Sequence, residues 1–377
     1  MRFPGFEEEW RHSTLRSECQ INPKTEQLAD TFLYIDLESV VKGQLVKTNY
    51  LKKEDAPSRA QRVLSKWDIL YQCVRPYQLN NYIVRDDVAI QRVASTGYAQ
   101  IRTNHDPDFF FQLIHTKTFT DQVINRCTGT NYPAINSTDL SGIEINLPGK
   151  EEQRKIGRML SLIDQRIAIQ NRVIEDLKKL KAAIEDRCFN QFQGKLVRLA
   201  VILNEKNEKS TRNNQYEVLS STVSGIYSQR DYFNKDIASA DNTGYKVIRR
   251  GDIVLSPQNL WMGNINYNDR FDIGIVSPSY KVFSINPMFN NNYVASLLKS
   301  KKALWEYSLV SEQGASIVRR NLSIEGFMEI AFPVPKREKQ NMIGDTIAAV
   351  NHRIELENGI LNGLNRQKLY LLDQLFI

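Results

Sequence analysis

The sequence predicts a duplicated α/β protein in which two mixed α/β domains are separated by two long α-helices. Three observations predict this class. The chain repeats itself after about half of its length, each repeat ends in a long segment with a heptad pattern of apolar residues, and the parts before those segments carry short β-rich runs between turn residues. At 377 residues, the chain is long enough for two domains of ordinary size.

The internal repeat is clearest in two segments that align at an offset of 187 residues. Pairs aligned at this offset include Pro148 with Pro335, Gln153 with Gln340, and Gly157 with Gly344. Upstream, the match continues at offsets of 182 to 184, and loop insertions produce such small changes of offset. We therefore predict four parts: a first domain over 1–150, a first helix over 151–193, a second domain over 194–335 and a second helix over 336–377.

The two long segments carry the pattern of helices that pack along their length. From Ile156 and from Ile343, apolar residues recur at alternating steps of four and three, which is the period of a coiled coil. Polar residues interrupt the two patterns at the same frame positions: Gln170 and Lys181 in the first, Glu357 and Lys368 in the second. The matching interruptions favour an antiparallel coiled coil, with the two domains related by a pseudo-two-fold axis. The alternative is that each helix packs only on its own domain.

The domains that precede the helices are predicted to mix strands and helices. Runs such as "DILYQCV" in the first and "YKVIRRGDIVLS" in the second are rich in β-formers and lie between Gly, Pro, Asn and Ser clusters. Each domain also has one predicted helix, over 107–124 and over 290–309. We assign the aromatic residues Trp67, Phe110 and Tyr280 to the cores.

The composition is that of a globular protein with a mild basic excess. The net charge of +7 and the pI near 9.0 are compatible with nucleic-acid binding without requiring it. No apolar run is long enough to span a membrane, and the acidic start "MRFPGFEEEW" is not a secretory signal, so we predict a cytoplasmic location. The four scattered cysteines predict reduced thiols rather than disulfides or a zinc site.

No motif in the sequence predicts a catalytic site. The four histidines are too scattered for a metal site, and neither a glycine-rich phosphate loop nor the Asn-Pro-Pro-Tyr signature of adenine methyltransferases occurs. The stretch "GIEINLPGK" is not a P-loop, because Glu151 stands where Ser or Thr would bind magnesium. We therefore predict a non-catalytic protein without its own metal or cofactor. A self-contained methyltransferase or nuclease is the competing hypothesis.

The candidate binding residues lie in loops that combine Lys and Arg with Asn, Gln, Ser and Tyr. Lys and Arg suit phosphates, Arg also suits guanine, and Asn or Gln suits adenine. By residue type, the DNA-binding candidates are Lys42, Lys47, Arg75 and Asn131 in the first domain and Gln258, Asn259, Arg319 and Arg320 in the second. For each of them, the competing interpretation is a solvated loop side chain.

The two long segments resemble the conserved regions of the DNA-specificity subunit of Type I restriction-modification enzymes. The residues that carry the resemblance are Pro148, Gln153, Ile156, Leu160 and Asp164 in the first segment, and Pro333, Pro335, Gln340, Ile343 and Ile347 in the second. Asn351 replaces the aspartate in the second segment. The start "RFPGFEEEWRHSTL" also resembles the lead-in to the family's first recognition domain.

The resemblance implies a non-catalytic subunit whose two target-recognition domains read a bipartite, asymmetric site on double-stranded DNA. It implies methyltransferase subunits and restriction/translocase subunits as partners, with S-adenosylmethionine, ATP and magnesium bound by those partners. Two alternatives stay open from sequence. One is a stand-alone, two-headed DNA-binding regulator, and the other is a specificity subunit of a related system that combines cutting and methylation.

Overall fold

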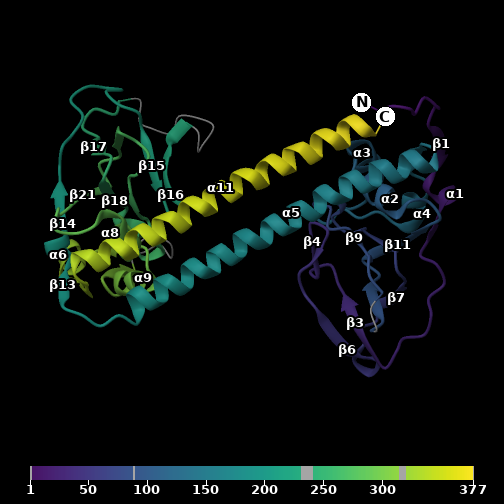
Figure 1. The fold of residues 1–377 in the computed structure, drawn as a ribbon, viewed down its shortest axis with the longest axis horizontal. Coiled ribbons are helices and arrows are strands. Elements are labelled where there is room, and N and C mark those ends of the chain that lie inside the picture. Colours follow the sequence, from purple (N-terminus) through teal and green to yellow (C-terminus); the bar gives the residue numbers. More distant parts are fainter. Residues whose placement is uncertain (1, 88–89, 231–240, 314–319, 377) are drawn as a thin grey trace. The chain divides into compact units, whose positions relative to one another are not determined.

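The protein is described by a computed structural model that covers residues 2–87, 90–230, 241–313 and 320–376. The chain forms two compact units, Met1–Arg172 with Gly359–Ile377, and Val173–Asn358. The long helices α5 (Lys150–Glu185) and α11 (Arg337–Leu375) each contribute one part to each unit (Figure 1). The predicted α/β class with two long helices is confirmed. The division into four parts at residues 150, 193 and 335 stays a prediction.

The first unit contains two four-stranded sheets. One has the order β2 (Cys19–Ile21), β11 (Tyr98–Thr103), β8 (Ile69–Gln72) and β9 (Tyr82–Ile83). The other has the order β6 (Asn49–Lys52), β3 (Thr31–Ile35), β10 (Arg92–Ser95) and β7 (Ala60–Leu64), in which only β3 and β10 run parallel. Two small pairs join β1 (Arg11–Thr14) to β12 (Glu144–Leu147) and β4 (Val40–Val41) to β5 (Gln44–Leu45).

Short helices cover and connect these sheets. They are α1 (Leu15–Glu18), η1 (Lys53–Asp55), η2 (Pro76–Gln78), α2 (Pro107–Leu113), α3 (Lys117–Arg126) and α4 (Ser137–Ser141). The segment 42–62, one of the predicted loops and the one that carries the candidates Lys42 and Lys47, is partly strand: β5, β6 and the start of β7 lie within it. Leu51 of β6 and Ala60 of β7 pack with the small core cluster of the second sheet, which explains why this otherwise polar stretch forms strands.

The second unit repeats the main elements of the first in the same order. Its four-stranded sheet runs β14 (Leu203–Lys206), β21 (Lys281–Ile285), β18 (Asp252–Leu255) and β19 (Ile265–Tyr267). Antiparallel pairs join β13 (Leu196–Arg198) to β24 (Ala331–Pro333), β15 (Leu219–Thr222) to β16 (Gly225–Ser228), β17 (Lys246–Arg249) to β20 (Ile273–Val276), and β22 (Ser311–Gln313) to β23 (Arg320–Leu322).

The helices of the second unit also follow the repeat. They are α6 (Leu199–Ile202), η4 (Pro257–Met262), α8 (Asn291–Leu298), α9 (Lys301–Leu309) and α10 (Ile324–Glu329). The π-helical segment η3 (Asp186–Asn190) extends α5. Most elements of the two folds therefore correspond, from the first strand pair through η2 or η4 to the last strand; among the described residues, β4, β5 and η1 occur only in the first unit, and β22 and β23 only in the second.

The single helix predicted in each domain is wrong, because each is two helices. The break falls at equivalent residues, Thr116 in the first unit and Ser300 in the second. The Thr116 hydroxyl accepts a hydrogen bond from the Phe119 amide at 3.3 Å, and the Ser300 hydroxyl accepts one from the Ala303 amide at 3.2 Å. These side chains cap the second helix of each pair, so the chain turns where the apolar pattern alone continues.

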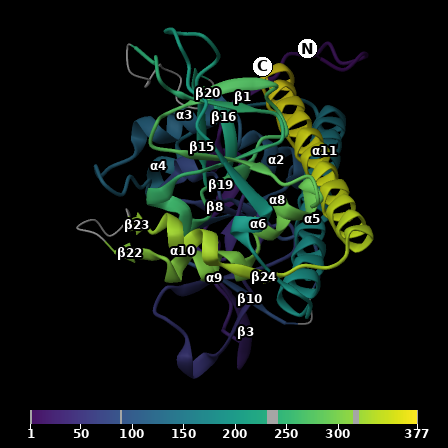
Figure 2. The ribbon, with the colours of Figure 1, turned by 90° about the vertical axis from the view of Figure 1, so that its left-hand side faces the viewer.

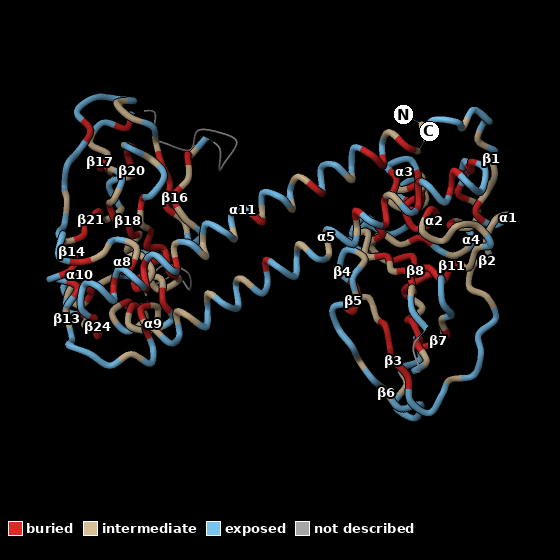
Figure 3. Tube along the Cα trace, viewed as in Figure 1, coloured by how far each residue is buried: buried red, intermediate tan, exposed pale blue. Residues whose placement is uncertain are grey.

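In each unit the two long helices pack side by side and run in opposite directions. In the first unit, Leu371 and Leu375 near the end of α11 share a core with Ile156 near the start of α5. In the second unit, Ile343 of α11 shares a core with Phe189, just beyond the end of α5. Figure 3 shows the buried residues gathered inside each unit. Pairing along the whole length and the pseudo-two-fold axis stay predictions.

The predicted seam of apolar residues agrees with the burial of both helices. Every residue assigned to it is buried or half-buried, the polar interruptions included. Lys368, one of these interruptions, donates to Asp164 at 2.6 Å within the first unit. Asp164 also accepts a hydrogen bond from Gln112 of α2 at 2.7 Å, so the ion pair joins both helices to the domain.

The repeated Gln and Gly residues anchor each long helix to its unit. The Gln153 amide group donates to the Pro148 carbonyl at 2.8 Å, and Gln340 donates to the Pro335 carbonyl at 2.9 Å. A Cβ at Gly157 would lie 2.5 Å from the Asp106 carboxylate, which caps α2, and a Cβ at Gly344 would lie 2.5 Å from the side chain of Asn290, which caps α8. The repeated motif therefore lets a helix cap approach the long helix closely.

Of the three aromatic residues assigned to the cores, one assignment is wrong. Phe110 is fully buried and Tyr280 packs half-buried against a small cluster, which agrees with the prediction. Trp67 is 40% exposed, because a positive φ of 71° at the turn before β8 directs its side chain outward. The four cysteines form no disulfide within the described chain. No helix among the described residues combines the length and apolarity needed to cross a membrane.

Candidate nucleic-acid interface

In the first unit, two loops meet beside η2. The loop after β8 and the loop that follows α3 are joined by a bridge between Val74 and Ala134, and the Arg75 amide donates to the Pro133 carbonyl at 2.8 Å. The β4–β5 hairpin adds Lys42, whose amide donates to the Asn80 side chain at 3.0 Å. Three predicted contact residues, Lys42, Arg75 and Asn131, are thereby carried by adjoining loops. Lys47 is exposed, with its ammonium 3.8 Å from Glu38.

The Arg75 side chain lies over an aromatic ring. Its guanidinium carbon is 4.4 Å from the centroid of the Tyr132 ring, which is 63% exposed. The backbone of Arg75 is left-handed, with φ of 55°, as are Leu79 at 54° and Lys42 at 47°. Such conformations cost of order 1 kcal/mol each for residues other than glycine and cluster at functional sites.

A buried hydrogen-bond network holds this loop in place. Asn81 accepts from the Gln72 amide at 2.8 Å and donates to His115 Nε2 at 3.3 Å. His115 Nδ1 donates to the Phe111 carbonyl, so Nε2 is the acceptor. Burial lowers the pKa of His115 to about 4, which keeps the ring neutral and this pattern intact at ordinary pH. Sequence analysis missed this network because its members are far apart in the chain.

The second unit brings its candidate residues together on the equivalent loops. Gln258 and Asn259 belong to η4, which follows β18 as η2 follows β8, and β23 packs beside η4. Figure 2 shows β22 and β23 beside α9 and α10. Arg320 opens β23, and its guanidinium carbon lies 4.2 Å from the Trp261 ring centroid. Gln258 is exposed, Asn259 is half-buried, and Arg319 lies outside the described residues.

Lys299, which sequence analysis missed, ties η4 to the neighbouring hairpin. Its ammonium donates to the Gly263 carbonyl at the end of η4 at 2.9 Å, and to the Val223 carbonyl in the β15–β16 turn at 3.0 Å. Burial, with a smaller contribution from the charge of Lys181, lowers the pKa of Lys299 to about 8. The Lys299 ammonium therefore holds η4 against the β15–β16 turn, and its hydrogen bonds go to backbone carbonyls of these two elements.

A second polar network fixes the strand that follows η4. Asn264 and Asn266 both bond to Ser221, with Nδ2 of Asn266 donating to the serine hydroxyl at 2.7 Å. Tyr280 donates to the Ser221 carbonyl at 3.0 Å, and burial raises its pKa. In the sequence "GNINYN", asparagine occupies every second position, and alternate residues of a strand point to the same face, so this pattern predicts a strand with one polar face.

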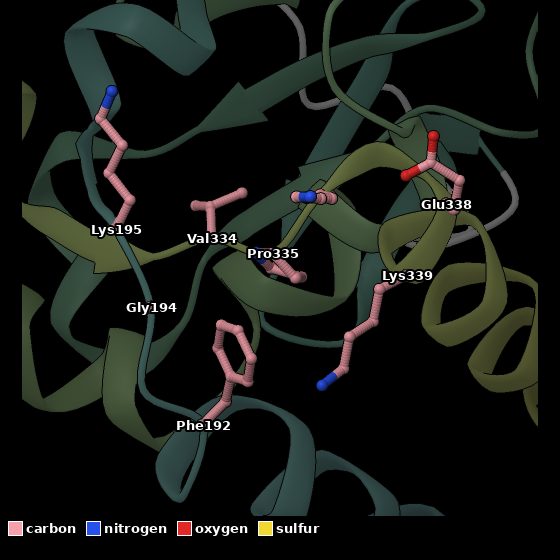
Figure 4. Close-up of a pocket in the computed structure, with 8 residues that line it drawn as sticks. Phe192, Gly194, Lys195, Val334, Pro335, Glu338 and Lys339 are labelled. Atoms are coloured by element: carbon pink, nitrogen blue, oxygen red, sulfur yellow. The ribbon is translucent and has the colours of Figure 1, made fainter.

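A pocket of about 540 Å³ lies in the second unit where α5 ends and α11 begins. Figure 4 shows its lining, with Lys339 extending beside Phe192, and the Lys339 ammonium lies 4.5 Å from the centroid of that ring. Glu338 is the single carboxylate among the lining residues, so the pocket offers no pair of groups for acid–base chemistry. Among the described residues, no cluster of three or more His, Cys, Asp or Glu side chains could hold a metal ion.

Comparisons with known proteins agree with this architecture. Residues 77–179 match the model of the Type I restriction modification DNA specificity domain. The Type I restriction enzyme HindI specificity subunit of Haemophilus influenzae is 25% identical over 165 residues, which are 42% of this chain and 36% of that one. The putative type I restriction enzyme MjaX specificity subunit of Methanocaldococcus jannaschii is 24% identical over 277 residues, 65% of this chain and 61% of that one. The chain thus spans less than two thirds of these curated relatives.

Two solved structures share the fold over almost the whole chain. The Type I restriction-modification system S subunit from M. genitalium has a TM-score of 0.63 at 18% identity, covering 100% of this chain and 97% of that one. A chain from a study of complex assembly and conformational transition of the type I R-M system has a TM-score of 0.53 at 20% identity and covers 98% of both chains.

The fold defines a duplicated α/β protein, with two similar domains that present different side chains from equivalent loops. The family model, the curated relatives and the solved structures all name the same kind of protein. The chain is similar to the specificity subunits of Type I restriction-modification systems: the family model matches residues 77–179, and the fold is that of an S subunit.

Proposed function

We propose that this protein is the DNA-specificity subunit of a Type I restriction-modification complex and reads a bipartite, asymmetric site on double-stranded DNA. The main support for the proposal is that the chain contains two copies of one fold whose equivalent loops differ in sequence. The two units place η2 and η4 at the same point of the same fold, but the residues there differ in type and order. Two different readers joined in one chain suit two different half-sites.

The residues proposed to contact DNA divide by chemistry. Lys42 and Lys47 suit phosphates because a flexible ammonium group needs no fixed plane. Asn131, Gln258 and Asn259 suit adenine edges, and Arg75, Arg319 and Arg320 suit guanine edges or phosphates. Lys47 is the least supported of these DNA contacts, because the carboxylate of Glu38 lies 3.8 Å from its ammonium and would repel a phosphate.

The proposed partners are methyltransferase subunits and restriction/translocase subunits, which would bind S-adenosylmethionine, ATP and magnesium. The long helices support docking of two equivalent partner subunits. Ile169 of α5 and Leu356 of α11 occupy repeat-equivalent positions and are 59% and 50% exposed. Val173 and Ile360, the next pair at this offset, are also exposed. Apolar side chains that recur on both helices suit the same partner surface used twice. The complex would act on DNA in the cytoplasm.

The test is adenine-methylation mapping by long-read sequencing in cells that carry this chain with its methyltransferase. We expect one new motif with two defined, non-identical halves separated by a fixed gap. Cells with the methyltransferase alone are the control and should lack the motif. A palindromic motif, or no new methylation, would contradict the proposal. If the purified chain alone bound one DNA sequence tightly, the stand-alone regulator would be favoured instead.

A further inference from the structure

Among the described residues, each recognition domain contains one arginine that lies over an aromatic ring. Equivalent loops supply the two pairs, but the loop that carries the arginine in one unit carries the aromatic ring in the other. In the first unit, Arg75 comes from the loop after β8 and Tyr132 from the loop after α3. In the second unit, Trp261 comes from the loop after β18 and Arg320 from the hairpin after α9. The pairing recurs although the loops exchange the two residue types, so the pair itself, and not one inherited residue, is common to both units.

Both arginines lack an acceptor within the part of the chain that the structure describes. Arginines elsewhere pair with carboxylates, for example Arg92 with Asp86 and Arg249 with Glu208. Neither Arg75 nor Arg320 has such a partner among the described residues, and the buried Nε of Arg320 has no hydrogen-bond acceptor there. A guanidinium carries five N–H donors, and a buried donor without an acceptor is costly. These donors are therefore available for a ligand.

The aromatic ring beside each guanidinium limits the orientations that the guanidinium can adopt. An aromatic ring against one face restricts the plane of the guanidinium, so less conformational freedom is lost when its N–H donors bind a ligand. At Arg75 the left-handed backbone, which is pinned by the bond to Pro133, adds to this placement. A fixed planar fork matches two coplanar acceptors. The O6 and N7 atoms of guanine form such a pair in the major groove.

We propose that Arg75 and Arg320 each read one guanine, one in each half of the DNA site, by donating to its O6 and N7 atoms. This inference rests on the proposed function, because it assigns a base to each recognition domain. The guanidinium must keep its geometry for base reading, whereas a phosphate contact needs mainly its charge. Lysine at either position would therefore lose the guanine preference although it keeps the charge.

The test measures the methylation motif of cells that carry the wild-type chain or a variant with the methyltransferase. Arg320→Lys should relax one guanine position in one half-site, with about 10–100-fold less discrimination there, and leave the other half unchanged. Arg75→Lys should do the same in the other half. Arg16→Lys and Arg212→Lys change exposed arginines outside these loops in the same way, keep the charge, and serve as matched controls that leave the motif unchanged.

Binding of the purified wild-type complex gives a second measurement that does not depend on a variant folding. Replacing the assigned guanine by 7-deazaguanine, which lacks N7, should weaken binding of the wild-type complex by about 10-fold and of the Arg320→Lys complex little further. The inference fails if a wild-type half-site has no guanine, or if Arg320→Lys weakens methylation equally at all sites without relaxing the preference for a base. In either case, a bipartite motif would still support the proposed function. If the wild-type chain yields no bipartite motif, the proposed function itself fails.

Discussion

Replacing Gly344 by alanine is expected to weaken the anchor between α11 and the second domain. An alanine Cβ at this position would lie 2.5 Å from Asn290 Oδ1 and 2.6 Å from the Tyr293 amide nitrogen. These two atoms form the cap of α8, in which the Tyr293 amide donates to Asn290 at 2.9 Å. The backbone of Asn290 also donates to Gln340 at 3.0 Å, so the cap cannot retreat without breaking a further bond.

The magnitude follows from three contributions. Loss of the cap costs about 1 kcal/mol, and forcing a methyl group into a packed site costs about 1–3 kcal/mol. Alanine regains about 1 kcal/mol of helix propensity relative to glycine. The net expectation is a loss of about 1–3 kcal/mol. For a unit of this size, each kcal/mol lowers Tm by about 2–4 °C.

Differential scanning calorimetry and urea unfolding would measure this loss, and the same helix offers a matched control. A Cβ at Gly363 would meet no atom within 4 Å, so Gly363→Ala should stabilise the protein by up to about 1 kcal/mol. Gly157→Ala in α5 should repeat the effect of Gly344→Ala, because its Cβ would lie 2.5 Å from Asp106 Oδ1. Equal stability of Gly344→Ala and Gly363→Ala would refute the anchoring role.

Three further predictions concern Lys299, the seam and the gap between half-sites. The pKa of Lys299 is about 8 in the folded protein and 10.5 in the unfolded chain, so the unfolded chain binds more protons between these two pH values. The free energy of unfolding of the wild-type protein should therefore rise with pH over this window by about 1–3 kcal/mol relative to that of Lys299→Met. A difference between the two proteins that does not change with pH would contradict this. For Asp164 and Lys368, a double-mutant cycle with Asp164→Asn and Lys368→Gln should give a coupling energy of about 1–2 kcal/mol, whereas additive losses would mean that the pair contributes nothing. Inserting four residues in α5 lengthens it by about 6 Å, close to two base pairs, so methylation mapping should find a changed gap between unchanged half-sites; altered half-sites would refute a spacer role.

The sequence by itself determined the duplication, the two long helices and the loops that carry the candidate contacts. Helical periodicity is a local property, since residues three or four apart share a face whatever surrounds them. This is why every residue assigned to the seam is buried or half-buried. The repeated Gln and Gly residues were visible as a motif, but their role required the caps of α2 and α8 that they contact.

Only the tertiary structure decided which loop side chains meet. Arg75 and Tyr132, or Trp261 and Arg320, lie far apart in the chain, and residue type alone does not select either pair among many polar loop residues. The exposure of Trp67 and the role of Lys299 are of the same kind, since both depend on a turn and on carbonyl groups that the fold brings together. Local patterns determine elements because their forces act over one or two helical turns, whereas a binding surface forms only when packing fixes distant loops against each other.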